Sequence, residues 1–160
     1  MRWVISILLV AVLPSFIPSC DSLPRDQAGT FDRIKTTREI RVGLIEQEPF
    51  VKTVNGEPAG VEVEIIKRFA AGIGAKPVWT HGGEERMMKS LERFELDMVA
   101  GGLTKATPWI KHVGITAAYR EEQIFAVAPG ENELVRRLDD FTHLHREEIE
   151  QLFADEGVSR

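Results

Sequence analysis

The sequence predicts an α/β fold, with a largely parallel β-sheet flanked by helices. Short apolar runs that suit strands alternate with stretches whose apolar residues recur every three or four positions. Glycine and proline separate these two kinds of segment. Strands that alternate with helices favour parallel pairing, because each helix carries the chain back to the start of the next strand.

The first twenty residues have the order of a secretory signal peptide. Arg2 supplies a positive start, residues 3–17 are almost wholly apolar, and the small residue Ser19 precedes the single cysteine, Cys20. The apolar run of about 15 residues is shorter than the ~20 that a bilayer-spanning helix needs. The ending resembles that of bacterial lipoproteins, in which the cysteine carries lipid. The alternative is an ordinary signal peptide with an incidental cysteine.

We therefore expect residues 1–19 to be a signal peptide, 20–30 a lipid-anchored tether and 31–160 one domain. The last range suffices for one core and is too short for two ordinary domains. The chain has 20 basic and 25 acidic residues, a net charge of −5. This balance argues against nucleic acid as a partner, because such binding needs a basic surface. It also leaves membrane attachment to lipid on Cys20.

The elements predicted before residue 75 are a helix, a strand, a hairpin and a second helix. Thr30 is placed to cap the first helix, and Asn55-Gly56 is a strong signal for a hairpin turn. The second helix has apolar residues on one face, and Gly74 then ends it. In order, the predicted ranges are helix 31–36, strand 40–45, hairpin strands 50–54 and 60–63, and helix 62–73.

The elements predicted after residue 75 continue the alternation and end in helices. Pro77 prevents the preceding helix from continuing. Gly82-Gly83 leads into a helix with two glutamates in its first turn, where the helix dipole favours acids. In order, the predicted ranges are strand 77–80, helix 84–94, strands 97–100, 112–116 and 123–128, and two helical stretches within 133–155.

Seven short segments stand in a characteristic order along the chain. They include Gly60-Val61-Glu62-Val63 entering a helix, Gly102-Leu103-Thr104, and Val113–Tyr119, which is similar to V-x-F-S-x-P-Y. Together they resemble the bacterial extracellular solute-binding proteins of family 3, the receptors of ABC importers for polar amino acids. The resemblance covers residues 31–128 and implies a periplasmic-binding-protein-like lobe. Family members have two lobes. The stretch after Tyr119 is too short for the second, so we expect it to be missing; a truncated reading frame would leave the same pattern.

The resemblance implies a ligand site at the carboxyl ends of the strands, where open α/β sheets bind ligands. By position, Gly102 and Thr104 match the family's backbone and hydroxyl contacts to the ligand. Gln47 and Glu84 fall where the family's clamp residues are often aromatic. The predicted ligand-binding residues are Gln47, Phe50, Glu84, Gly101, Gly102, Thr104 and Trp109.

Trp109 departs from the family, because it falls where an arginine binds the α-carboxylate of the ligand. An indole cannot replace the paired hydrogen bonds of a guanidinium. Its ring face attracts cations, and the acidic residues Glu46, Glu48 and Glu84 nearby would add to that attraction. The hypothesis is a cationic or amine ligand. The alternative is that Trp109 packs against the edge of the lobe and the acids are solvated.

We expect no catalytic residue, no metal and no cofactor. No nucleophile motif, phosphate loop or zinc spacing occurs in the sequence. His81 with Glu84 and Glu85 is most simply part of a capping turn. Some relatives of this fold are dehydratases or regulatory domains of peptidoglycan-cleaving enzymes, so an enzyme would need an acid–base pair within the cleft.

The sequence thus predicts an extracytoplasmic solute-binding lipoprotein of an ABC-type importer, in the periplasm or cell envelope. Its expected partners are a small polar solute, amino-acid-like or amine, an ABC permease or other envelope protein, and the membrane through the lipid anchor. The alternative is a one-lobed envelope interaction or sensory module that has lost transport-related ligand binding. An exposed apolar patch beside Trp109 would favour that alternative.

Overall fold

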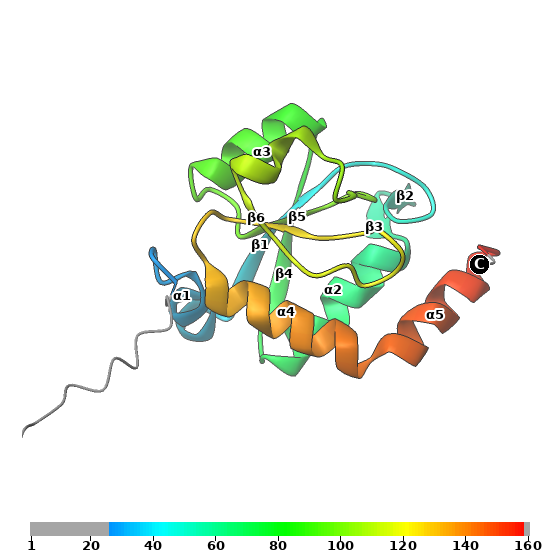
Figure 1. Cartoon of the computed structure of the whole chain (residues 1–160). Coiled ribbons are helices and arrows are strands. Elements are labelled where there is room, and N and C mark those ends of the chain that lie inside the picture. Colours follow the sequence, from blue (N-terminus) through cyan, green and yellow to red (C-terminus); the bar gives the residue numbers. More distant parts are fainter. Residues whose placement is uncertain (1–25, 159–160) are drawn as a thin grey trace, which may run out of the picture.

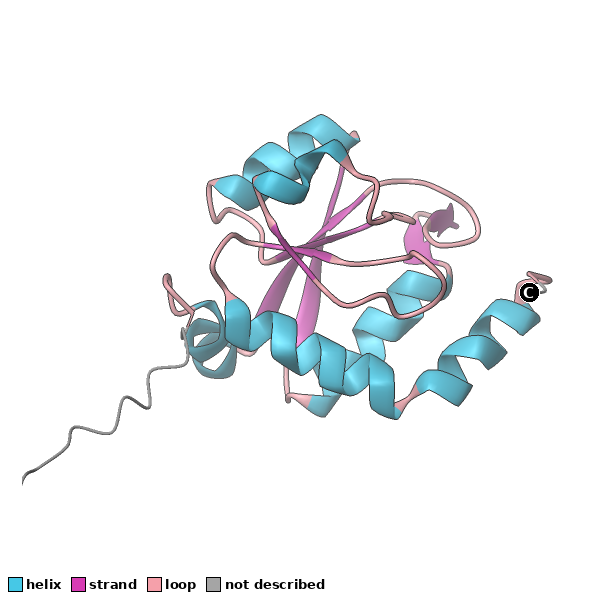
Figure 2. Ribbon diagram, viewed as in Figure 1, coloured by secondary structure: helices cyan, strands magenta, loops and turns pink. Residues whose placement is uncertain are grey.

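The computed structural model describes residues 26–158 (Figure 1). The predicted signal peptide, the lipidation at Cys20 and most of the tether lie outside these residues. In the described part of the chain, five strands form one sheet with helices on both faces (Figure 2).

The sheet has the strand order β4-β1-β5-β7-β6. Strand β1 pairs in parallel with β4 on one side and β5 on the other, whereas β7 runs antiparallel to both β5 and β6. The predicted α/β class with a mostly parallel sheet is therefore confirmed. The strand bounds are β1 Glu39–Leu44, β4 Lys76–His81, β5 Met98–Ala100, β6 Gly114–Ile115 and β7 Ala126–Val127.

Two apolar cores lie on the two faces of the sheet. Met98 and Ala100 of β5 face the larger core, while Val99 between them faces the smaller one, as the alternation of a strand requires. The larger core is covered by α1 (Thr30–Thr37), α2 (Val61–Gly72), α4 (Asn132–Leu144) and α5 (Arg146–Asp155). The smaller core lies under α3 (Glu84–Glu92) and the short 3₁₀ helix η1 (Pro108–Lys111).

The predicted hairpin forms around Asn55-Gly56. Its strands are β2 (Lys52–Val54) and β3 (Glu57–Ala59), and both turn residues have positive φ, 53° and 84°. The expectation of a strand over residues 60–63 is wrong, because α2 begins at Val61. The first amides of that helix, those of Val61 and Glu62, donate to the carbonyls of Pro49 and Phe50 in the loop after β1.

The expectation that Thr30 caps the first helix is also wrong, because α1 begins at Thr30 itself. Two carboxylates, a nearby one of Asp26 and a distant one of Glu131, accept the N–H groups at and just before its start. The buried carboxylate of Glu131 accepts hydrogen bonds from the N–H groups of Ala28, at 2.7 Å, and Thr30, at 2.8 Å. The carboxylate of Asp26 accepts from Phe31 at 2.9 Å. Glu131 lies 101 residues from Thr30 in sequence, so local spacing could not reveal this cap.

Candidate functional site

The loops that follow β1 and β5 pack tightly against each other at the carboxyl edge of the sheet. Gly102 has φ +65°, and a Cβ atom placed there would lie 2.6 Å from Cδ2 of Phe50 and 3.1 Å from Cδ of Gln47. At Gly101 the same atom would lie 2.6 Å from Cβ of Ile45. Only glycine permits this approach. The structure therefore brings together four of the seven predicted residues: Gln47, Phe50, Gly101 and Gly102.

A fully buried carboxylate, that of Glu62 at the start of α2, lies directly beneath this edge. It accepts hydrogen bonds from the N–H of Gly101 at 2.6 Å, from the N–H of Gly102 at 3.2 Å and from the hydroxyl of Tyr119. Burial raises the pKa of Glu62 from 4.5 to about 7, against the opposing effect of these hydrogen bonds.

The N–H of Gly102, one of the backbone groups that we expected to contact a ligand, therefore already donates its hydrogen bond to Glu62. Sequence reasoning did not single out Glu62 as a site residue. The available signal was an acid between two apolar residues, Val61 and Val63, directly after Gly60. An acid at that position has to be either exposed or bonded inside the protein, and the structure shows that it is bonded.

Thr104 and Trp109 lie further along the loop after β5. Thr104 forms a single β-bridge with Gln123, and its hydroxyl accepts from the N–H of Ala106 at 3.4 Å. Trp109 is half-buried in η1 and packs against the smaller core, with its ring edge-on to His112 at 6.1 Å between centroids. The indole thus has a packing role, and a ligand contact from its exposed part stays a prediction.

The acids of the predicted site are exposed. Glu84 is in the first turn of α3 and has no described hydrogen bond or ion pair within residues 26–158. Glu46 accepts a hydrogen bond from the hydroxyl of Thr53 in the hairpin, and Glu48 is exposed beside it. The structure therefore places negative charge after β1 and at the start of α3. Glu84 is not one of the residues that approach Gly102 together with Gln47 and Phe50.

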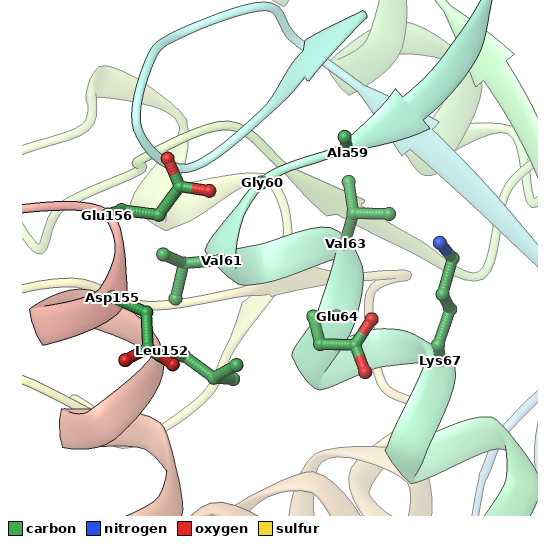
Figure 3. A pocket seen from close by; sticks show the side chains of 9 residues that line it. All are labelled: Ala59, Gly60, Val61, Val63, Glu64, Lys67, Leu152, Asp155 and Glu156. Carbon is green, nitrogen blue, oxygen red and sulfur yellow. The ribbon is translucent and has the colours of Figure 1, made fainter. Parts of the chain in front are cut away.

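A pocket of about 230 Å³ lies between the start of α2 and the end of α5 (Figure 3). Its apolar lining includes Val61, Val63 and Leu152, and charged side chains stand around it. Two of these charges are already paired: Glu156 with Lys52 at 2.5 Å and Glu64 with Arg68 at 3.2 Å. Acids whose charges are neutralised by neighbours attract a ligand weakly, so we assign no site here.

Neither a metal cluster nor a bilayer-spanning helix is found among residues 26–158. In that range no three His, Cys, Asp or Glu side chains are grouped so that they could hold a metal ion. None of the helices there has the length and apolar content that crossing a bilayer requires.

Sequence comparison matches residues 40–160 to the bacterial extracellular solute-binding proteins, family 3. The membrane-bound lytic murein transglycosylase F of Yersinia enterocolitica serotype O:8 / biotype 1B is 32% identical over 117 residues, which are 72% of this chain and 23% of that protein. The protein of the same name from Photobacterium profundum is 29% identical over 114 residues, 69% of this chain and 21% of its own length. The chain therefore spans less than a quarter of these relatives.

Solved structures share the fold. The arginine-bound form of domain 1 from TmArgBP has a TM-score of 0.65 at 23% identity, and the match covers 71% of this chain and 98% of that one. The ancestral cationic amino acid solute-binding protein AncCDT-1 has a TM-score of 0.71 at 15% identity, with 79% and 98% covered. Identities this low show a common architecture, and a single lobe accounts for the match.

Proposed function

Because the chain belongs to the bacterial extracellular solute-binding proteins of family 3, we propose that it binds a small polar solute at the carboxyl edge of its sheet. The family and the fold support a solute-binding role. The observation that carries the proposal is the contact of Gln47 and Phe50 with Gly102, whose N–H donates a hydrogen bond to the buried carboxylate of Glu62. This contact makes a preformed wall from two loops, and preformed walls reduce the entropy lost on binding.

The solute we propose carries a positive charge. By the family resemblance, Trp109 falls where an arginine would bind a carboxylate. The exposed acids Glu46 and Glu48 follow β1, and Glu84 begins α3. A cation gains from an indole face and from carboxylates, whereas an anion would meet only repulsion from those acids. Neighbouring structures described as arginine-bound or as binding cationic amino acids support this class by analogy.

We further propose that the protein works in the cell envelope, held by lipid on Cys20, as the receptor of an ABC permease. The family name, extracellular solute-binding proteins, supports the location, as do relatives described as membrane-bound. The remaining ligand-site assignments, Thr104 and Trp109 above all, belong to the same proposal.

A second candidate function is that of a sensory or interaction lobe for a peptidoglycan-cleaving enzyme. The observation that favours it is the 32% identity to a lytic murein transglycosylase F. The two candidates differ in their partner. Crosslinking of the tagged chain in intact cells, followed by mass spectrometry, should recover a permease for the first and a transglycosylase for the second.

The solute proposal is tested by thermal denaturation of the full chain, purified in mild detergent, against basic amino acids, polyamines and neutral amino acids. A ligand that binds only the folded state, at 100 times its dissociation constant, adds about 2.7 kcal/mol to stability. We expect a basic amino acid or a polyamine to raise Tm and neutral amino acids to have no effect. A cooperative transition that none of these compounds shifts would contradict the proposal.

Variants then locate the binding. Thr104→Val and Trp109→Ala should each reduce the ligand-induced rise in Tm, measured against each variant's own ligand-free Tm. The matched control is Thr36→Val, because Thr36 is an exposed residue of α1, which precedes β1 and so lies toward the opposite end of that strand. An unchanged rise in both site variants would place the ligand elsewhere.

A further inference from the structure

A second pocket, of about 360 Å³, lies between the segment that joins β6 to β7 and the first part of α5. In Figure 1 this segment is yellow and α5 is orange to red. The volume falls in the range of sites that hold small molecules. None of the seven predicted ligand residues lines it. The lining residues are Ala118, Tyr119, Arg120, Glu121, Arg146 and Glu150.

Arg120 is the unusual member of this lining. Only 7% of its side chain is exposed, and its guanidinium lies over the ring of Phe153, 4.2 Å from the centroid. Its Nε is 3.4 Å from a carboxylate oxygen of Glu150 and has no hydrogen-bond partner within residues 26–158. A guanidinium carries five N–H donors, and burying one of them without an acceptor, here the Nε–H, costs free energy. The position therefore calls for a further acceptor.

A second guanidinium belongs to the same pocket. Arg146 is the first residue of α5 and is exposed, so it contributes positive charge from the side opposite the β6–β7 segment. Two guanidinium groups that line one small pocket suit a carboxylate, because each can donate paired N–H groups to its two oxygens. The pocket also holds the acids Glu121 and Glu150, so its net charge is near zero and paired hydrogen bonds, more than net charge, would hold a carboxylate.

We propose that this pocket binds the carboxylate of a small solute, held by Arg120 and Arg146. The site is separate from the carboxyl edge and does not depend on the function proposed there. The aromatic face of Phe153 and the ion pair with Glu150 hold the Arg120 side chain in place before the ligand arrives. Such preorganisation lowers the entropic cost of binding.

The test follows the Nε–H resonances of arginine by ¹⁵N–¹H NMR in the full chain during titration with succinate. Succinamide is the uncharged counterpart of similar shape. We expect succinate to shift the Arg120 resonance saturably and succinamide to leave it in place. The loss of one resonance in Arg120→Lys assigns the signal. A shift that grows linearly and equally for all arginines, or no shift, would overturn the proposal.

Arg146→Gln keeps the test independent of the folding of the Arg120 variant, because Arg146 is on the surface. We expect it to weaken succinate binding by at least about tenfold, the effect of losing a hydrogen-bonded charge. The matched control is Arg137→Gln, which does not line this pocket. Like Arg120, Arg137 lies over an aromatic ring, that of Phe31 at 5.1 Å, but it is exposed and paired with Glu133. Equal affinity in Arg146→Gln and the unmodified chain would contradict the proposal.

The carboxylate could belong to a free solute or to the carboxyl terminus of a peptide. Acetyl-dialanine with a free carboxyl end, compared with its amide, separates the two sources. Peptide binding tighter than succinate binding would indicate a chain terminus, and the reverse a free solute. Thr104→Val should leave either titration unchanged, which separates this site from the carboxyl edge.

Discussion

The hydroxyl of Tyr119 donates a hydrogen bond to the buried carboxylate of Glu62, 57 residues earlier in the chain. The same carboxylate accepts the N–H groups of Gly101 and Gly102. One side chain therefore joins the start of α2, the loop after β5 and the segment after β6. Burial raises the pKa of both partners, to about 7 for Glu62 and above the ordinary value for Tyr119.

The raised pKa of Glu62 predicts that stability falls as the pH rises through the neutral range. Between about 4.5, its ordinary pKa, and about 7, the folded chain holds a proton at Glu62 that the unfolded chain has released. The contribution is complete below pH 4.5 and is lost by the time the pH passes 7. It amounts to about 3 kcal/mol of the free energy of unfolding.

Urea denaturation at several pH values between 5 and 8 measures this contribution. Glu62→Gln should remove most of the decline in stability across that range, because a glutamine has no proton to lose there. Glu64→Gln, on the same helix but half-exposed, is the control and should keep the decline. Parallel stability profiles for Glu62→Gln and the unmodified chain would show that Glu62 does not titrate as argued.

Gly102→Ala should destabilise the chain more than Gly56→Ala. Both residues have positive φ, +65° and +84°, so both alanines incur the backbone cost of about 1–2 kcal/mol. At Gly56 a Cβ atom meets nothing within 4 Å, whereas at Gly102 it collides with the ring of Phe50. We expect an additional loss of about 1–3 kcal/mol at Gly102, seen by denaturant unfolding. Equal losses would mean that Phe50 moves away freely.

Asp97→Asn should be strongly destabilising. The carboxylate of Asp97 is fully buried and bonds Arg33 at 2.5 Å and the side chain of Arg41 at 2.6 Å. Removing its charge leaves two arginines without their partner, at a cost of about 3 kcal/mol. Asp32→Asn is the comparison, since Asp32 is 82% exposed in its ion pair with Lys35 and should change little. A small effect at Asp97 would show that solvent screens both arginines.

Glu131→Gln should loosen the first turn of α1. One oxygen of Glu131 accepts from Ala28 and the other from Thr30, and a glutamine can replace only one of these acceptors. We expect a loss of about 1–2 kcal/mol, with faster hydrogen exchange at residues 28–31 and unchanged exchange in β1. Glu133→Gln, which removes only exposed ion pairs to Arg136 and Arg137, should leave exchange in α1 as it was.

The order of the elements was predictable from the sequence because each has a local signal. Asn55-Gly56 marks its own turn, and the apolar spacing of α2 records which face is buried. The ends of the elements were harder to predict. Gly60 was assigned to a strand, yet α2 starts at the next residue, because the first amides of α2 donate to carbonyls in the loop after β1. Thr30 has a suitable cap side chain, but Glu131 satisfies that amide instead.

The candidate site was predictable only in part. The loops that contribute Gln47, Phe50 and Gly102 follow strands, and parallel strands bring their carboxyl ends together, so this contact could be predicted from the sequence. The hydrogen-bond partner of the Gly102 N–H could not be predicted. Glu62 looks like any acid in a helix until the fold places it beside the loop after β5.

By itself, the sequence determined the class of fold, the order of its elements and the family, because these depend on residue spacing along neighbouring positions. Only the tertiary structure decided which acids are buried: Glu62, Asp97 and Glu131. Whether a carboxylate is solvated or enclosed depends on segments far away in the chain. Burial and distance to a partner arise only once those segments meet, and they set both its pKa and the stability that depends on it.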